Sequence, residues 1–308
     1  MKKFLSLLIV FVLLMSVFSF VSAQDAEEYA YAVAAPNGAP GIVLASLAVE
    51  NPDAYTFLAA DTITAEFSNE NSDFVIAPIN AGAKLYKAGK STYKLGAVVT
   101  WGNLYFASQR ENFTLEDIAE NEVTLFGENT INASIALYAL EANGITPKSV
   151  AYLAGAANTQ SLLLSDASAI VLTAEPALTA ATMKNENITS YSVNELYKGA
   201  TGFDGYTQAG LFIKAKTIEE HPEVVDSFLS LVAESAEKCE SDLAAVSEAV
   251  AALEILPNAK VAQTAIPHCA IRFVSALDAK EQVEATANVD LTQFGGAVPA
   301  DDFYYGAE

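Results

Sequence analysis

The chain has 308 residues, of which 16 are basic and 38 acidic, so its formal net charge at pH 7 is −22. A chain this acidic is repelled by phosphate backbones and by anionic lipid, so we expect no nucleic-acid or peripheral membrane binding. The two histidines, His221 and His268, match no zinc or haem spacing. We therefore expect no metal site and no cofactor.

The N-terminal residues predict export. Lys2 and Lys3 precede an apolar run, and Val21-Ser22-Ala23 offers small residues of the kind that signal peptidase recognises. Residues 1–23 are therefore expected to form a signal peptide. The alternative is an uncleaved anchor, because the apolar run approaches the length that spans a bilayer.

The next elements alternate short β-branched strands with helices, which is typical of βαβ units and a largely parallel sheet. The expected strands are Ala30–Val33, Tyr55–Ala60, Asp73–Ala77, Leu95–Thr100 and Leu104–Ala107. Helices are expected over Gly41–Val49 and over Pro78–Tyr86, where the proline suits the first turn.

A second series begins near Phe113. Its expected strands are Val123–Phe126, Val150–Leu153, Ala169–Leu172 and Ser190–Val193. The helix Ile131–Ala142 is expected to end at Asn143-Gly144, because both residues adopt a left-handed conformation readily. Tyr206–Ile213 is expected to be a strand again, and Thr217–Ala285 to be helical.

The chain forms one α/β series, then a second, and then returns to the first. This order indicates an α/β fold of two lobes made from discontinuous segments. We expect one lobe over residues 24–108 and 207–308, a second over 109–206, and crossings near Ser108 and Thr207. Two crossings form a natural hinge, with the ligand in the cleft between the lobes.

Candidate ligand-binding residues stand where strands lead into helices, because ligands of open α/β sheets bind beyond the carboxyl ends of the strands. They are Asn37, Gly38, Ala39, Pro78, Asn80, Asn129, Thr130 and Glu175. Each has a purely local alternative. The Asn37-Gly38 pair also suits a tight turn, Asn80 a backbone contact, and Thr130 and Glu175 the start of a helix.

The crossings supply three further candidates. Trp101 is the only tryptophan and could stack on a planar ligand, while Asn103 and Gln208 could donate and accept hydrogen bonds. The alternative for Trp101 is burial under the crossing, as tryptophan is usually buried. Cys239 and Cys269 could form a disulfide in an exported protein, or could remain unpaired buried thiols.

Several segments carry a family resemblance over nearly all the chain that follows the signal. They are APNGAP (35–40), DFVIAPINAGAKLYKAG (73–89), YKLGAVVTWGNLYFAS (93–108), FGENTINA (126–133), AEPALT (174–179), AIPHCAIRF (265–273) and GGAVPADDFYY (295–305). In this order and spacing the sequence resembles the type II periplasmic binding proteins, close to the branch for sulfonates, nitrate and thiamine precursors.

The resemblance implies a monomer that captures a small-molecule ligand and delivers it to the transmembrane subunits of an ABC permease. Relatives in Gram-positive organisms carry a lipid-modified cysteine after the signal, and none stands here. We therefore expect a location in the periplasm or at the cell surface. The alternatives are an exported enzyme or a sensor domain on the same fold, although the sequence shows no nucleophile elbow, triad motif or Walker loop. The charge of the ligand stays open.

Overall fold

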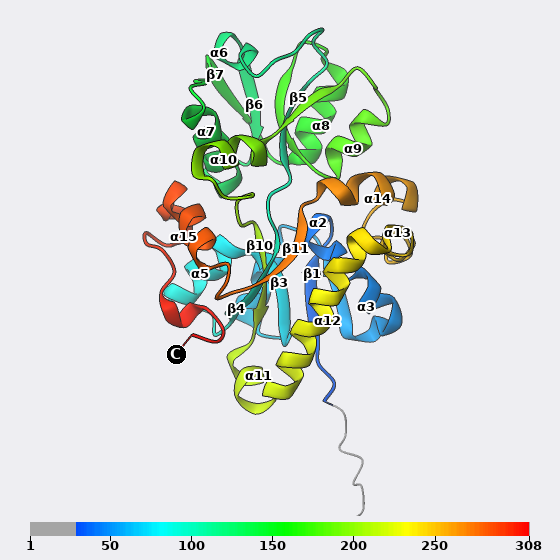
Figure 1. Ribbon diagram of the computed structural model, residues 1–308, viewed down its shortest axis with the longest axis vertical. Coiled ribbons are helices and arrows are strands. Elements are labelled where there is room, and N and C mark those ends of the chain that lie inside the picture. The colour runs from blue at the N-terminus through cyan, green and yellow to red at the C-terminus, as the bar shows by residue number, and fades with distance from the viewer. Residues whose placement is uncertain (1–28, 308) are drawn as a thin grey trace, which may run out of the picture. The chain divides into compact units, whose positions relative to one another are not determined.

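Two mixed β-sheets organise the chain in the computed structural model, which describes residues 29–307 (Figure 1). The expected signal peptide, residues 1–23, lies outside the described residues. We call the first sheet with its helices the first lobe, and the second sheet with its helices the second lobe. Both lobes lie within one compact part of the chain, residues Tyr31–Glu308.

The first sheet has six strands in the order β11-β4-β10-β3-β1-β2. They are β1 Val33–Pro36, β2 Tyr55–Leu58, β3 Phe74–Pro78, β4 Lys94–Thr100, β10 Ala209–Ile213 and β11 Ile271–Ser275. Strand β1 pairs in parallel with β2 and β3, whereas β10 runs antiparallel to β3 and β4. Ala209 is opposite both Pro78 and Thr100, so β10 begins where β3 and β4 end.

The second sheet has five strands in the order β7-β6-β8-β5-β9. They are β5 Leu104–Ser108, β6 Glu122–Phe126, β7 Ser149–Leu153, β8 Ile170–Ala174 and β9 Thr189–Ser192. Strand β6 is parallel to β7 and β8, and β5 is antiparallel to β8 and β9. The strand that enters the second lobe therefore runs against its neighbours, as β10 does in the first lobe.

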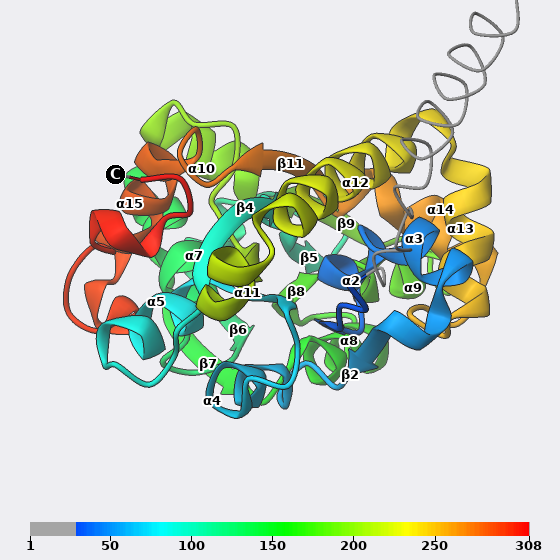
Figure 2. The same cartoon turned by 90° about the horizontal axis from the view of Figure 1, so that it is seen from below.

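Helices cover both sheets. In the first lobe they are α2 Ala39–Ile42, α3 Ala45–Glu50, α4 Glu66–Asn69, α5 Ile79–Lys87, α11 Ala215–Glu220, α12 Pro222–Ser241, α13 Leu243–Ala252, α14 Ala259–Ala265 and α15 Lys280–Val289. In the second lobe they are α6 Asp117–Glu120, α7 Ile131–Ala142, α8 Ala156–Ser165, α9 Ala177–Thr182 and α10 Val193–Thr201. The long helix α12 packs along β11, and α3 lies against α13 (Figure 2).

Short 3-10 helices fill the connections: η1 Pro52–Ala54, η2 Ile63–Ala65, η3 Ile266–His268, η4 Leu291–Phe294 and η5 Asp301–Phe303. The segment α15–η4 follows β11 in the chain. Helix α15 contacts α7 of the second lobe, and α14 contacts α9 (Figure 1).

The cores follow the alternation of side chains along the strands. In β10, Phe212 packs into a cluster on one face of the first sheet, while Leu211 and Ile213 pack into a cluster on the other. In β5, Phe106 joins the main core of the second lobe, and Ala107 joins a smaller cluster with α8 and α9. Both sheets are therefore buried on two faces.

Several sequence expectations differ from the structure; the helix expected over Gly41–Val49, for example, is divided into α2 and α3. The sheets are mixed rather than largely parallel, because the strands next to the crossings run backwards. Strand β11 lies inside the stretch expected to be helical, as the edge partner of β4. The first strand is Val33–Pro36 instead of Ala30–Val33, since it is Val33 that aligns with Tyr55 and Phe74.

The first crossing also differs in position. Strand β5 belongs to the second sheet, so the chain changes lobe at residues 101–103 rather than near Ser108. The return runs through residues 202–208, which includes the expected crossing at Thr207. None of the described helices is both long and apolar enough to span a membrane.

Candidate functional site

A cavity of about 310 Å³ lies at the ends of the strands. Pro36 and Asn37 enter its wall from the end of β1, Pro78 and Asn80 from the junction of β3 with α5, and Gln208 from the start of β10. These segments meet because β3 and β10 are antiparallel neighbours and β1 is the parallel neighbour of β3. The wall is therefore built at the edge where the sequence predicted ligand contacts.

The second lobe contributes the start of α7. Thr130, Ile131 and Asn132 line the cavity, and Gln293 of η4 completes this side. The cavity is thus bounded by residues that are far apart in sequence and that come from both lobes.

Five predicted residues line the cavity: Asn37, Pro78, Asn80, Thr130 and Gln208. Sequence reasoning missed two amides on the same wall. Asn132 stands in the segment FGENTINA, and its place in the first turn of α7 could have identified it as a residue of the site. Gln293 lies in a short 3-10 helix of the C-terminal region and carried no such signal.

The turn after β1 is tightly held. Gly38 has a φ of 95°, a conformation that favours glycine, and the Asn37 N–H donates to the carbonyl of Leu58 at 2.8 Å. Ala39 is buried in the core below and lies outside the cavity wall, as does Gly38. Of these three predicted residues, only Asn37 is on the wall.

The start of α7 is held from the other lobe. The Gln293 amide donates to the carbonyl of Asn129 at 3.0 Å, and the Ser134 hydroxyl donates to the Asp290 carboxylate at 2.8 Å. The Thr130 hydroxyl donates to the Gly127 carbonyl at 2.6 Å and does not cap the helix. Asn129 contributes its carbonyl to this contact between the lobes and is not on the cavity wall.

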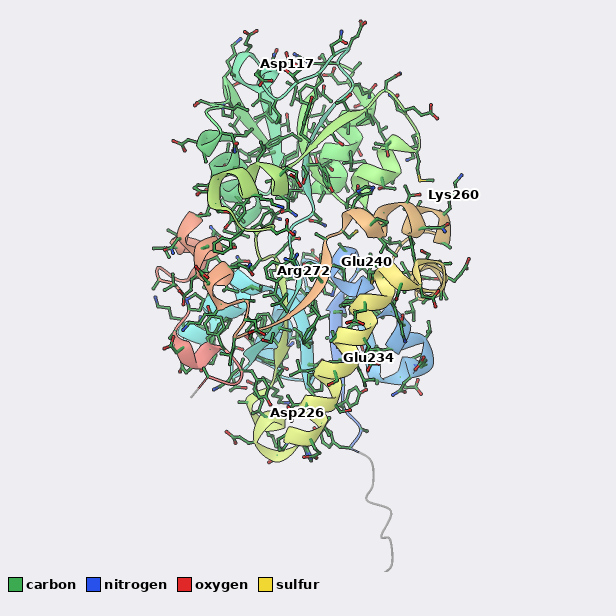
Figure 3. All side chains as sticks on the ribbon, viewed as in Figure 1. Asp117, Asp226, Glu234, Glu240, Lys260 and Arg272 are labelled. Atoms are coloured by element: carbon green, nitrogen blue, oxygen red, sulfur yellow. The ribbon has the colours of Figure 1, made fainter. Side chains whose placement is uncertain are left out.

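Trp101 is packed inside the crossing. Its side chain is 1% exposed, its indole N–H donates to the carbonyl of Arg272 at 2.9 Å, and the Arg272 guanidinium lies 4.3 Å from the ring centroid. Arg272 projects from β11 (Figure 3) and also donates to the Asp204 carboxylate at 3.3 Å. The alternative of burial under the crossing therefore describes Trp101, and its ring does not reach the cavity.

The two crossings lie against each other. Gly102 and Gly205 both have positive φ values, and a Cβ atom at Gly102 would overlap the ring of Tyr206. The Asn194 amide donates to the carbonyls of Trp101 and Gly102 at 2.8 and 2.9 Å. Both glycines are thus required by close approach as well as by backbone conformation.

A chain of hydrogen bonds joins Glu175, Asn103 and Gln208. The Asn103 amide N–H donates to the backbone carbonyl of Glu175 at 2.8 Å, and the Gln208 amide N–H donates to the Asn103 side-chain oxygen at 2.9 Å. Gln208 lines the cavity, whereas Asn103 and Glu175 are buried behind it, 6% and 5% exposed. Three predicted residues are therefore connected, but only one is on the wall.

The Glu175 carboxylate serves the start of α9. One oxygen accepts a hydrogen bond from the Thr179 N–H at 3.1 Å, next to a cis peptide bond between Glu175 and Pro176. Burial raises the pKa of Glu175 above its ordinary value, and the hydrogen bonds from Thr179 oppose this shift. In this contact Glu175 serves the start of a helix, which is the local role that the sequence offered as the alternative to ligand binding.

Cys239 and Cys269 are unpaired and buried in one apolar cluster with parts of α13 and α14. Burial raises the pKa of Cys239 to about 12, and burial likewise raises the pKa of Cys269 well above its ordinary value. Both thiols are therefore protonated at neutral pH and are poor nucleophiles. Across the described residues, no group of three or more His, Cys, Asp or Glu could hold a metal ion.

The wall chemistry suits binding by hydrogen bonds and apolar contact. Five carboxamides and one hydroxyl alternate with prolines, alanines and isoleucines, and no ionisable side chain occurs among the described residues that line the cavity. Such a site can orient a solute through directed hydrogen bonds and apolar contact.

Comparisons with known proteins place this geometry in a fold. No protein-family model matches the chain, and no curated protein matches its sequence. Among solved structures, an ABC transporter protein of Parabacteroides distasonis superposes with a TM-score of 0.79 at 19% identity, covering 91% of this chain and 100% of that one.

Two further structures are similar to the chain. The periplasmic aliphatic sulphonate-binding protein of Escherichia coli has a TM-score of 0.67 at 16% identity, covering 86% of this chain and 88% of that one. A ligand-binding component of an ABC-type import system of Staphylococcus aureus, with zinc bound, has a TM-score of 0.68 at 10% identity and covers 90% of this chain and 96% of its own.

At these identities the likeness establishes the fold. The chain has the two-lobed α/β fold of the periplasmic binding proteins, which confirms the fold class predicted from the sequence. The solved structures with this fold include an ABC transporter protein, a periplasmic sulphonate-binding protein and a ligand-binding component of an ABC-type import system.

Proposed function

We propose that the protein is the extracytoplasmic solute-binding component of an ABC importer. It captures a small molecule between the two lobes and delivers it to the transmembrane subunits of a permease. The observation that carries the proposal is the cavity, because residues of both lobes line it and lobe closure would enclose a solute there. The shared fold supports the same function.

The proposal keeps the export, the location and the monomeric state that the sequence predicts. An exported monomer, in the periplasm or at the cell surface, has lobes that hinge at residues 101–103 and 202–208. Asn37, Asn80, Thr130 and Gln208 contact the solute, and Asn132 and Gln293 join them. The Ser134–Asp290 and Gln293–Asn129 hydrogen bonds join the lobes beside the cavity in the closed form.

An exported enzyme on this fold is the less favoured function. Catalysis needs a nucleophile or an acid–base pair within reach of the solute. The described wall offers amides, one hydroxyl and apolar groups, and Cys269 is fully buried with a protonated thiol. Binding followed by release is the function that these groups can perform.

The test is a thermal-shift panel of small solutes on the protein recovered from the compartment to which its host exports it. A ligand at 100 times its dissociation constant stabilises the folded form by about 2.7 kcal/mol, which raises the midpoint by roughly 5 °C. We expect a selective shift with a compound that mass spectrometry recovers unchanged. Chemical conversion of that compound would contradict the proposal.

A further inference from the structure

We infer that the solute held in the cavity is uncharged and carries hydrogen-bond donors as well as acceptors. This inference rests on the proposed function and deepens it. The polar part of the wall consists of Asn37, Asn80, Thr130, Asn132, Gln208 and Gln293. A side-chain amide carries both donor and acceptor atoms, so a wall of amides complements a neutral solute with both kinds of group.

An anionic solute would lack a countercharge here. Burying an ion costs far more than burying a neutral polar group unless an opposite charge pairs with it. The chain has two arginines, and both are engaged elsewhere. Arg110 donates to the carbonyl of Ser168 at 2.7 Å, and Arg272 lies against Trp101 and Asp204. The net charge of −22 adds long-range repulsion.

Gln208 is fixed from behind the wall. The backbone carbonyl of Glu175 can only accept, so it fixes the orientation of Asn103, whose side-chain oxygen in turn accepts from the Gln208 N–H. The Gln208 side-chain oxygen is itself buried, so it is not among the acceptors that the wall offers to a solute. The acceptors for a solute N–H or O–H come from the other wall amides.

The helix starts at the cavity do not reverse this conclusion. At α5, the first N–H, of Ile79, already donates to the Gln208 carbonyl at 3.1 Å. At α7, the Asp290 carboxylate lies on Ser134 in the first turns, where it offsets the positive end of the helix dipole. The N–H groups that remain can bind a neutral carbonyl or ring nitrogen, but they offer an anion little net charge.

Matched pairs of probes test the inference because they change charge while keeping shape. The pairs are methanesulfonamide with methanesulfonate and nicotinamide with nicotinate, each titrated by calorimetry at two salt concentrations. We expect the neutral member of at least one pair to bind at least tenfold more tightly than its anion, with no dependence on salt. Tighter binding of the anions overturns the inference but leaves the proposed function standing. Failure of every probe, followed by failure of the wider thermal-shift panel, contradicts both.

A variant separates contact with a wall amide from a general effect on folding. Asn80→Leu removes one amide of the wall, so it should lower the ratio of neutral to anionic affinity at least tenfold. Asn69→Leu, the same change at an exposed position of α4, should leave both affinities unchanged. If Asn80→Leu weakens both members of a pair equally, the wall amide does not distinguish a neutral solute from an anion and the inference fails.

Discussion

The hydrogen bond between Ser134 and Asp290 gives a direct prediction about lobe closure. Ser134 belongs to α7 of the second lobe, and Asp290 begins η4 next to the first lobe. The Ser134 hydroxyl is 2.8 Å from one carboxylate oxygen, while the other accepts from the Thr292 N–H at 3.1 Å and from its hydroxyl at 2.5 Å. We predict that Ser134→Ala weakens solute binding.

The magnitude follows from the kind of bond. A hydrogen bond to a charged group contributes about 1.5–3 kcal/mol, and both partners are only partly buried, so we take the lower end. A loss of about 1.5 kcal/mol corresponds to a roughly tenfold rise in the dissociation constant. Alanine is a better helix former than serine, so the ligand-free stability of α7 should not fall.

The pKa of Asp290 determines the pH range over which the hydrogen bond to Ser134 persists. Burial acts to raise this pKa, but hydrogen bonds from Thr292 and Ser134 outweigh it and lower the pKa below its ordinary value of 3.8. Because the pKa is lowered in the folded form, the ionised carboxylate contributes its full stability at pH values above 3.8. That contribution to stability is lost as the pH falls through the pKa of the folded form. The contact is therefore fully present at neutral pH.

The assay is calorimetric titration of the compound selected by the solute panel, together with urea unfolding of the ligand-free protein. Thr292→Ala is the matched control, since it removes a hydroxyl from the same carboxylate without removing a contact between lobes. Its affinity should stay within about twofold of the unmodified protein. Equal losses in both variants, or a lower urea midpoint with unchanged affinity in Ser134→Ala, would refute the reasoning.

Three further predictions concern buried groups. Gly210→Ala places a methyl group into the Leu95 side chain and should cost about 1–3 kcal/mol in urea unfolding, whereas Gly155→Ala, which meets only an atom 3.8 Å away, should cost less than about 1 kcal/mol. Cys239 and Cys269 should not react with a thiol reagent in the folded protein and should yield two thiols in denaturant, and a yield of none would show a disulfide instead. Because burial raises the pKa of Glu175, its protonated form stabilises the fold, and this stability is lost as the pH rises from the ordinary value of 4.5 through the raised pKa. Glu175→Gln should therefore flatten the pH dependence of the urea midpoint above about pH 5, and an unchanged dependence would exclude this cause.

The sequence predicted most of the fold because its apolar runs and helix signals are local. The helix Ile131–Ala142 has the predicted bounds, and most strands differ by one or two residues. Strand β11 escaped prediction because its segment follows a long helical stretch, and only its pairing with β4 makes it a strand. Strand direction was equally inaccessible, since the antiparallel β5 and β10 result from the crossings.

The candidate site was only partly predictable. Residues beside strand ends, such as Asn37, Asn80 and Thr130, follow from the rule for open α/β sheets and do line the cavity. Gln293 reaches the wall through the tertiary contact of η4 with the start of α7, which no local pattern encodes. Trp101 also depends on a tertiary contact. Arg272 is distant from it in sequence but covers its ring, so the ring does not reach the cavity.

A crystal structure of the protein with its selected solute tests the central claim most directly. The account predicts the solute between the two lobes, in contact with Asn80, Thr130 and Gln208, with a donor group of the solute at a side-chain oxygen of a wall amide. A solute bound outside this cavity, or within one lobe alone, would contradict capture by lobe closure.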